Sequence, residues 1–262
     1  MIDKIISEIS PAYGVCSFEK VKNQLIHCRG EVKIPENAKS VIVMIFPYYF
    51  GSEAYTDSDI SKYACVRDYH IVANALMEKA ATELKEVYPD NSFVTFSDNS
   101  PIPEVSAAVF AGLGVKGRNG LLINEKYGSY VFIGEIVTDL ELPTTENGKT
   151  ECSGCNLCVK SCPVNAISEN GIDKTLCLSA VTQTKKDLTA EQEDSIRKSQ
   201  CLWGCDICQD VCPMNRNVTV SPISLFKDGF ETKMRTDGDI SDRAYAWRGK
   251  KVIERNKAIL HN

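Results

Sequence analysis

The sequence contains no apolar run long enough to cross a lipid bilayer. Its longest aliphatic stretch is Val41–Phe46, whereas a membrane-spanning helix needs about 20 apolar residues. The N-terminal segment Met1–Glu8 interrupts its apolar residues with charges, so it does not have the continuous apolar core of a signal peptide. We therefore expect no membrane association and a cytoplasmic protein.

The chain also lacks an excess of basic residues. Its 30 lysines and arginines are outnumbered by 35 acidic residues, which gives a formal net charge of −5. This balance argues against a general nucleic-acid binder. No internal repeat or low-complexity segment is present either. With 262 residues and 43% hydrophobic content, the chain can bury a full core in one large domain or two unequal ones.

The first 146 residues carry the patterns of an α/β domain. The apolar run 41–46 and the segment 93–96 predict strands. A helix is expected from a cap at Asp59 or Ser61 through Leu84, and another from Ser100 at the N-cap to Gly112. The segments 121–124 and 130–137 read as a hairpin. A turn-rich link, Thr144–Lys149, would then lead into a cysteine-rich domain over 147–220 and an extension over 221–262 with a basic helix from about Tyr245 to Leu260.

Cysteine is the residue that the sequence has in abundance. Nine of its twelve cysteines lie between Cys152 and Cys212. Disulfide scaffolds are typical of short secreted chains, and this chain is neither short nor secreted by its pattern. Structural zinc is the second alternative, but a four-ligand zinc site would leave half of these cysteines unexplained.

The spacing of these cysteines is that of bacterial ferredoxins. The first run is Cys152, Cys155, Cys158 and Cys162, followed by Pro163; the second is Cys201, Cys205, Cys208 and Cys212, followed by Pro213. This spacing predicts two [4Fe–4S] clusters in a pseudo-symmetric domain. Eight ligands are needed and nine cysteines are present, so spacing alone leaves either Cys177 or Cys201 as the spare.

Several further segments occur together in a set order: Lys62–His70, Ser97–Glu104, Gly112–Asn119, Gly128–Ser129, Gly134–Asp139 and both cysteine runs, including Gly204–Gln209. In these segments the chain resembles the epoxyqueuosine reductase family, which consists of corrinoid-dependent iron–sulfur enzymes of tRNA modification. The resemblance covers roughly residues 40–262.

The resemblance implies an overall α+β fold, with a nitroreductase-like α/β catalytic domain followed by a bacterial ferredoxin-like domain with two [4Fe–4S] clusters. It implies that the catalytic domain (1–146) holds a cobalamin. Clusters of low potential, reaching about −700 mV, suit the reduction of cobalt. The ligand sets that it implies are Cys152, Cys155, Cys158 and Cys212 for one cluster and Cys162, Cys177, Cys205 and Cys208 for the other, with Cys201 spare.

Three residues match catalytic positions of the family. Asp98 matches the proton donor, which must protonate the oxygen released when an epoxide is reduced to an alkene. A carboxylic acid can do this at neutral pH only if its pKa is raised. Tyr69 and His70 match active-site positions. The structural alternatives are a helix cap for Asp98, a core aromatic for Tyr69 and an ordinary helix histidine for His70.

A glycine-rich segment supplies the candidate corrinoid contacts. The spacing of Gly112, Gly114 and Gly117 has the dinucleotide fingerprint, but it follows a helical pattern instead of a strand, which argues against nucleotide binding. We expect such a loop to lie against the corrinoid amides or a phosphate. The candidate contacts are Gly114, Lys116, Gly117, Arg118 and Asn119.

The sequence departs from the family in three places. The N-terminal region lacks the family's His-Gly-x-Met-x-Tyr segment, and Gly117–Gly120 replaces a Gly-Lys-Asn-Thr motif. The family's C-terminal helical repeats, which help to bind tRNA, have no counterpart here, so tRNA binding is expected less strongly. The basic residues of the last predicted helix suit phosphate contacts, or form a solvated face.

The first hypothesis is therefore an epoxide reductase of the epoxyqueuosine reductase type, acting on tRNA or on a smaller related substrate. It would be a monomer that takes electrons from an external low-potential donor of the flavodoxin or ferredoxin type. The alternatives are a ferredoxin-type electron-transfer protein without corrinoid chemistry, and a sensing protein that uses the clusters structurally.

Overall fold

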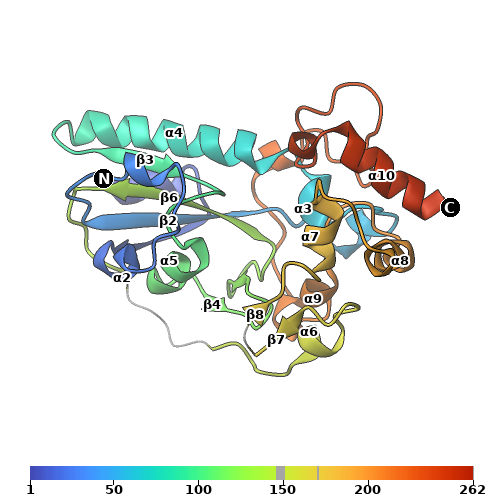
Figure 1. Ribbon diagram of the computed structural model, residues 1–262. Helices are drawn as coiled ribbons and strands as arrows, with labels where there is room; N and C mark the ends of the chain where they lie inside the picture. Colours follow the sequence, from blue (N-terminus) through green and yellow to red (C-terminus); the bar gives the residue numbers. More distant parts are fainter. Residues whose placement is uncertain (146–150, 170, 262) are drawn as a thin grey trace. The chain divides into compact units, whose positions relative to one another are not determined.

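The computed structural model describes residues 1–145, 151–169 and 171–261 (Figure 1). The chain forms two compact units that interleave along the sequence. The first comprises Met1–Pro47, Tyr69–Lys116 and Leu121–Cys152, and the second Tyr48–Asp68, Gly117–Gly120 and Ser153–Asn262. The sequence instead suggested three consecutive segments. Their boundary at 146/147, and the linker up to Lys149, lie partly outside the described residues.

A four-stranded antiparallel sheet forms the centre of the first unit. Its order is β1-β2-β6-β3. Every residue of the central strand β2 is buried, because the sheet is covered on both faces and such strands read as continuous apolar runs. The strands are β1 (Ala12–Ser17), β2 (Ser40–Pro47), β3 (Phe93–Phe96) and β6 (Val131–Thr138). The strands predicted over 41–46 and 93–96 are confirmed.

Helices cover the two faces of this sheet (Figure 1). The long helix α4 (Tyr69–Val87) lies on one face, with α1 (Ile2–Ser7) beside it, and α2 (Glu19–Lys22) and α5 (Glu104–Phe110) lie on the other. Gly134 eases the close packing on the α4 side, because a Cβ there would lie 2.4 Å from the Met77 sulfur and that side chain would have to move. Among the described residues no helix, α4 included, is long and apolar enough to span a membrane.

Three local predictions before the cysteine runs were right in part: the helices and strands are present, but their limits or their partners differ. The helix expected from Ser61 is interrupted, because Val66 is extended and ends the short helix α3 (Lys62–Cys65) before α4 begins. The next helix, α5, begins after Pro103 and not after Ser100 as predicted. The Ser100 hydroxyl instead accepts the Ile102 N–H in a separate turn. The predicted hairpin does not form. The short strand β5 (Leu122–Ile123) pairs with β4 (Val115–Lys116), while β6 is drawn into the central sheet.

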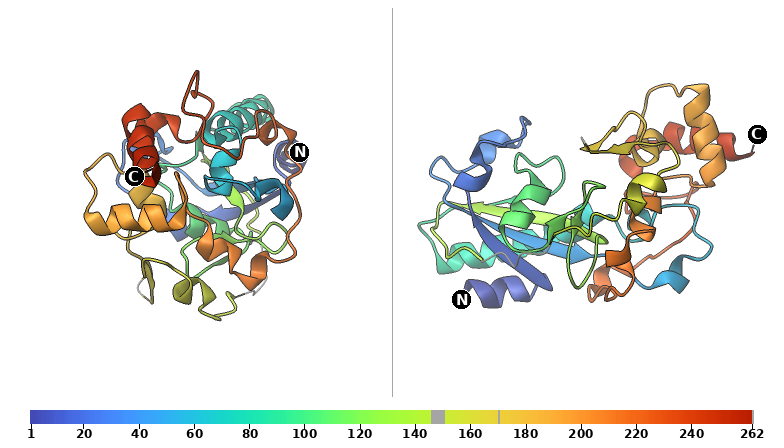
Figure 2. Two further views of the ribbon diagram at one scale, coloured as in Figure 1. Left: turned by 90° about the vertical axis from the view of Figure 1, so that its right-hand side faces the viewer. Right: turned by 90° about the horizontal axis from the view of Figure 1, so that it is seen from below.

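The second unit is built from short helices and two-residue strands. Its largest fully buried side chains include Trp203, Arg243, Tyr245 and Phe226. The longer helices α8 (Ala190–Ser199) and α10 (Lys250–His261) pack on one another, as Figure 2 also shows. The predicted C-terminal helix is present as α10, preceded by a 3-10 turn. The elements are the helices α3, α6 (Leu157–Lys160), α7 (Leu178–Gln183), α8 (Ala190–Ser199), α9 (Ile207–Asp210) and α10 (Lys250–His261), the strands β7 (Ile167–Ser168) and β8 (Gly171–Ile172), and the 3-10 turns η2 (Ser52–Tyr55), η3 (Pro213–Asn215), η4 (Ser224–Phe226) and η5 (Ala246–Arg248); η1 (Glu31–Lys33) belongs to the first unit.

Candidate functional site

An acid–histidine pair lies where β3 ends and α4 begins, within the first unit. Asp98 follows β3 by two residues, and His70 is the second residue of α4. The His70 Nε2 and Asp98 Oδ2 atoms are 3.3 Å apart. The two side chains are 36% and 54% exposed, so both can be reached from solvent. The structure thus brings together two of the three predicted catalytic residues.

Tyr69 completes the expected set from the neighbouring position. Its ring stacks on Phe132 of β6, with centroids 4.2 Å apart and planes at 12°. It also lies against His70, with centroids 4.0 Å apart. The Tyr69 side chain additionally hydrogen-bonds to the Asp98 carboxylate. Stacking on Phe132 fixes the tyrosine ring beside the acid.

The pair stands at the edge of a pocket of about 440 Å³. The segment Arg29–Lys33 also contributes to the lining and adds two cationic side chains, Arg29 and Lys33. This segment is anchored through neighbours, since the Ile26 N–H donates to the Pro101 carbonyl and the Cys28 thiol to the Asn99 carbonyl. The lining residues are Arg29, Gly30, Lys33, His70, Asn74, Glu78, Thr95, Phe96, Ser97, Asp98 and Asn99.

The electrostatics of Asp98 differ from the expectation. The hydrogen bond from His70 lowers the pKa of Asp98 to about 2, helped by the Asn99 N–H and Tyr69 and opposed by burial. A proton donor needs a raised pKa, but this carboxyl is half exposed and well hydrogen-bonded, both of which favour its ionised form. In this geometry Asp98 is a carboxylate at neutral pH and must receive a proton before it can act as an acid.

Two acids near the Asp98 turn were missed as site residues from the sequence: Glu104, which is partly buried, and Glu135, which is fully buried. Burial raises the pKa of Glu104 to about 7, with the Asp98 charge adding to it. Glu135 lies in the middle of β6 and is fully buried. Burial raises its pKa well above the usual range, the Glu104 charge adds to this, and the Ser100 hydroxyl opposes it. A single acid inside the apolar run of β6 was the sequence signal, since buried carboxylates are rare and often functional.

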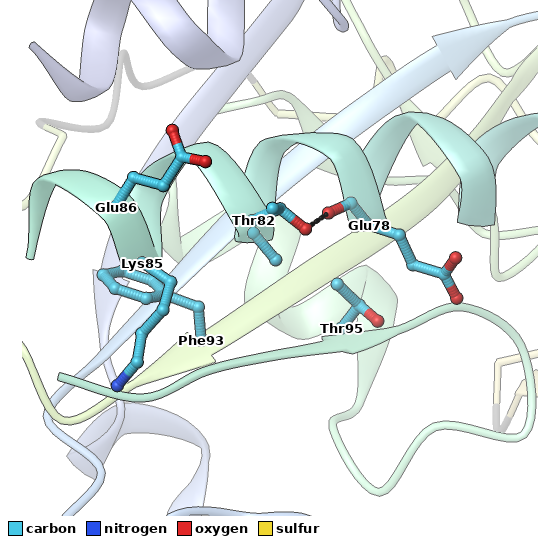
Figure 3. A pocket seen from close by; sticks show the side chains of 7 residues that line it. Glu78, Thr82, Lys85, Glu86, Phe93 and Thr95 are labelled. Atoms are coloured by element: carbon cyan, nitrogen blue, oxygen red, sulfur yellow. Dashed lines mark hydrogen bonds between the residues drawn. The ribbon is translucent and has the colours of Figure 1, made fainter. Parts of the chain in front are cut away.

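A second, larger hollow lies along α4 and the edge strand β3 (Figure 3). Its volume is about 580 Å³, and its lining consists of Glu78, Ala81, Thr82, Lys85, Glu86, Phe93 and Thr95. None of the predicted catalytic residues reaches it. The smaller pocket at Asp98 is therefore the better candidate for chemistry.

In the second unit, four predicted ligand cysteines lie near one another. The Cys205 thiol is close enough to Cys162 and Cys177 for their charges to raise its pKa, although burial is the larger cause. Cys205 and Cys177 act in the same way on Cys208. These four are the set that the family resemblance assigns to one cluster.

Nitrogen donors already point at two of these sulfurs. The Ala166 N–H lies 3.2 Å from the Cys162 sulfur, and the Asn119 amide lies 3.8 Å from the Cys208 sulfur. Hydrogen bonds to the sulfurs are one of the means by which proteins tune iron–sulfur clusters. Such donors fit thiolate ligands of a cluster.

The remaining predicted ligands, Cys152, Cys155, Cys158 and Cys212, stand at intermediate or exposed positions. The Leu157 N–H, followed by Ser153, lowers the pKa of the Cys155 thiol, which favours the thiolate form that binds iron. Within the described residues, no three cysteine, histidine or acidic side chains converge tightly enough to hold a single metal ion. A cubane binds one thiolate at each of four separate irons, so its ligands stand farther apart than those of zinc.

Cys201 has a different environment. Its thiol donates to the carbonyl oxygens of Trp203 and Gly204, at 3.3 and 3.4 Å. Burial raises its pKa to about 12. Burial raises the pKa of the proposed ligand Cys208 to about 12 as well, so the distinguishing feature of Cys201 is that its thiol is turned toward backbone carbonyls, which suits the spare cysteine better than a ligand.

A buried ion pair ties the Lys62–His70 motif to the second cysteine run. The Lys62 N–H donates to Asp206 at 2.6 Å, and its ammonium lies 2.7 Å from Asp210. Lys62 and Asp206 are only 13% and 10% exposed. The Tyr48 hydroxyl adds a contact to Gln209 at 3.4 Å. These contacts explain why residues 48–68 fold with the cysteine domain.

The candidate corrinoid residues divide between the units. Gly114 and Lys116 belong to the first, where a Cβ on Gly114 would lie 2.2 Å from the Ile123 carbonyl oxygen. Gly117, Arg118 and Asn119 belong to the second. There Arg118 lies 3.8 Å from Glu169, and Asn119 is buried and directed at Cys208. The glycine at 114 thus has a packing reason of its own.

The basic face of α10 is partly structural. The Arg255 guanidinium donates to the carbonyls of Thr184 and Lys186, so it braces the start of the loop before α8. Lys250, Lys251 and Lys257 are exposed. Only part of the predicted phosphate-binding stripe is therefore available to a ligand.

The fold and these centres define an iron–sulfur reductase. Residues 151–215 match the family model described as "4Fe-4S double cluster binding domain", and residues 32–99 match the one described as "Epoxyqueuosine reductase QueG, DUF1730". The expectation of an oxidoreductase with two [4Fe–4S] clusters is confirmed, and the electron-transfer alternative is not favoured because the match extends into the first unit.

Curated relatives specify the family. An epoxyqueuosine reductase of Leadbetterella byssophila is 34% identical over 234 residues, which cover 86% of this chain and 75% of the relative. The enzyme of Cyclobacterium marinum is 38% identical and covers 70% of this chain and 61% of the relative. The enzyme of Lactococcus garvieae is 29% identical and covers 84% and 68%. This chain belongs to the epoxyqueuosine reductase family.

Solved structures agree in fold. The structure of epoxyqueuosine reductase from Streptococcus thermophilus superposes with a TM-score of 0.80 at 24% identity, covering 99% of this chain and 79% of that one. An epoxyqueuosine reductase with an epoxyqueuosine-modified tRNA stem loop superposes with a TM-score of 0.77 at 22% identity and the same coverage. The expected α+β architecture is confirmed. Family membership also supports the expected cofactors, two [4Fe–4S] clusters and a cobalamin.

Proposed function

We propose that this protein reduces an epoxide to an alkene, with epoxyqueuosine in tRNA or a smaller related epoxide as the substrate. The chain spans between 44% and 68% of the length of the first three curated relatives, so their full activity is transferred as a proposal. The observation that carries it is the Asp98–His70 pair at the edge of a pocket, in a chain of this family.

In this proposal Asp98 delivers protons to the departing oxygen, His70 orients the carboxyl group, and Tyr69 holds both in place by stacking on Phe132. When bound, the cobalamin supplies the reducing metal centre, and the clusters bring electrons to it. The cobalamin would be held by Gly114, Lys116, Gly117, Arg118 and Asn119.

The cluster ligands are proposed as two sets of four. One cluster is held by Cys162, Cys177, Cys205 and Cys208. This set is supported by the effect of the neighbouring cysteine charges on the pKa values of Cys205 and Cys208 and by the N–H donors to two of the sulfurs. Cys152, Cys155, Cys158 and Cys212 hold the other.

We further propose tRNA as a substrate carrier, since a family structure contains a tRNA stem loop and the exposed lysines of α10 suit phosphate contacts. The donor would be a low-potential flavodoxin or ferredoxin in the cytoplasm, where thiols stay reduced. The expectation of a monomer stays a prediction.

The test uses the full chain with its clusters reconstituted under anaerobic conditions. Cobalamin is added and its retention is followed in the visible spectrum, and reduction is then measured on queuosine-precursor tRNA and on the free epoxide nucleoside. Asp98→Asn should lower the rate by about 10²- to 10⁴-fold, the usual contribution of a positioned acid, with cobalamin retained.

The matched control is Asp90→Asn, which removes an exposed carboxylate of the same unit and should leave the rate unchanged. The proposal would be contradicted if the wild-type protein retained no corrinoid. It would also be contradicted if Asp98→Asn reduced the substrate as fast as the wild type.

A further inference from the structure

A carboxyl group is buried in the central sheet, beside the end of β3 that leads to Asp98. Glu135 lies opposite Phe96 of β3 and Val43 of β2, and none of it is exposed. Its side chain lies on the same face of β6 as those of Ile133 and Val137, which pack in the core on the α5 side. Neither of its carboxyl oxygens makes a hydrogen bond of normal geometry to a described group.

Glu104 connects this interior to the candidate acid. It is the first residue of α5, the helix on that face of the sheet. Its Oε1 atom accepts the Asp98 backbone N–H at 2.8 Å. The charges of Asp98 and His70 act on Glu104, and the charge of Glu104 acts on Glu135. Glu135 thus lies in the core, Glu104 lies at the start of α5 bound to the Asp98 backbone, and Asp98 and His70 line the pocket.

The other titratable groups around the pair are few among the described residues. Cys16 of β1 is buried and feels the charge of Glu135, and Lys20 in turn acts on Cys16. Burial raises the pKa of the Cys16 thiol to about 11, so it stays neutral. No cation that the structure describes makes an ion pair with Glu104 or Glu135. Such a pair keeps at least one proton near neutral pH, because two ionised carboxylates would repel each other in a dry interior.

The proposed reaction needs such protons. Conversion of an epoxide to an alkene and water consumes two electrons and two protons. Asp98 carries one proton at a time, and its surroundings keep it ionised. Each turnover therefore requires that Asp98 be protonated twice.

We propose that Glu104 and Glu135 form a proton store that reloads Asp98, with Glu104 as the group from which the proton leaves. This inference rests on the proposed function. In each reload an O–H bond on Glu104 breaks and one forms on the Asp98 carboxylate, directly or through one water. The pair is left with one additional negative charge until solvent returns a proton to it. No electron moves in this step. Both glutamates act through Asp98, so they are positioning and relay residues.

The experiment uses the full chain with clusters and cobalamin and two isosteric variants. Glu104→Gln keeps an oxygen to accept the Asp98 N–H but cannot carry the proton. Glu135→Gln keeps the volume and neutrality of the buried group but cannot exchange a proton. Glu86→Gln is the matched control, because Glu86 is an exposed carboxylate of α4 in the same unit, at the hollow drawn in Figure 3.

Two readouts are combined. Infrared difference spectroscopy detects protonated carboxyl groups in the folded protein without any turnover. We expect a band of a buried, protonated carboxyl at neutral pH, which is lost or shifted in both glutamine variants and unchanged in Glu86→Gln. Single-turnover reduction is then measured against pH in water and in D₂O.

The wild-type rate should fall as pH rises through the pKa of Glu104, because the donor form is the protonated one. Glu104→Gln should lower the rate about tenfold or more, remove this high-pH limb and change the solvent isotope effect, with little change in KM. Glu135→Gln should change the pH at which the rate begins to fall. Glu104→Asp, which can still carry a proton, should restore part of the rate.

If the infrared band of a protonated carboxyl is absent, or if neither variant changes it, Glu104 and Glu135 do not store a proton. This conclusion holds whatever activity the variants have. A band that behaves as expected, together with unchanged rates and pH profile in Glu104→Gln, overturns the relay and leaves a structural pair. If the wild-type protein reduces no epoxide, the proposed function fails and the relay with it, while the infrared result still decides whether the pair holds a proton.

Discussion

At Asp98 the backbone adopts a conformation that few residues tolerate. Asp98 and Asn99 have φ values of 46° and 39°, in the left-handed region that costs energy for residues with a side chain. The turn is held by the Asn99 N–H on Asp98 and by the Asp98 N–H on Glu104. Backbone strain of this kind collects at functional sites. The second of these bonds also links the acid to Glu104, one of the two glutamates of the proposed proton store.

Of the nine cysteines between Cys152 and Cys212, one is not needed as a cluster ligand. We predict that Cys201→Ser retains about eight irons per chain, the content of two [4Fe–4S] clusters, because the Cys201 thiol is turned to backbone carbonyls. The matched change Cys208→Ser should lose about four irons. Iron and acid-labile sulfide analysis of the reconstituted proteins is the measurement. A loss of about four irons in Cys201→Ser would show that this cysteine is a ligand.

At the scale of elements, β1 and α5 approach each other through a glycine. A Cβ on Gly14 would lie 1.9 Å from the Ala111 carbonyl oxygen, whereas a Cβ on Gly134 would meet the flexible end of Met77 at 2.4 Å. Backbone cannot move aside as a side chain can, so strand and helix would have to separate.

We therefore predict that Gly14→Ala destabilises the protein by about 3 kcal/mol or more, at or above the usual range for overpacking, and that Gly134→Ala costs clearly less. Chemical denaturation monitored by the loss of sheet circular dichroism checks the order. Equal losses for the two variants would mean that α5 shifts readily on the sheet.

At the scale of the whole molecule, the two units differ in what holds them together. The first has a sheet with a fully buried central strand. In the second, α6 has four residues and no buried side chain, and β7 and β8 have two residues each. Helices of this length are not stable on their own. We expect the cysteine ligands on either side to supply order that segments of this length do not generate alone.

Removal of the clusters should therefore act on one unit only. We predict that the iron-free protein loses amide-exchange protection in Leu157–Lys160 and Ile167–Ser168, while β2 keeps it, because metal binding supplies folding energy where the core does not. Hydrogen exchange with mass spectrometry, on protein with and without iron, compares these segments. Unchanged protection in α6 without iron would show that the loops are ordered by packing alone.

The sequence by itself determined the cofactor chemistry, because cluster binding depends on the spacing of ligands within short segments. The runs from Cys152 to Cys162 and from Cys201 to Cys212 therefore identify the domain without a structure. The strands 41–46 and 93–96 were equally predictable, since a buried strand is a local apolar run. The motif around Asp98 pointed to the pocket through family resemblance.

Only the tertiary structure decided the partners of β6, the proton affinity of Asp98 and the burial of Glu135. Strand pairing joins segments that are far apart in the chain: β6 resembled half of a hairpin but pairs with β2 and β3. The pKa of an acid depends on burial and on neighbours from other elements, such as His70 beside Asp98 and Glu104 near Glu135. Those neighbours are brought together by folding, and no local pattern in the sequence records them.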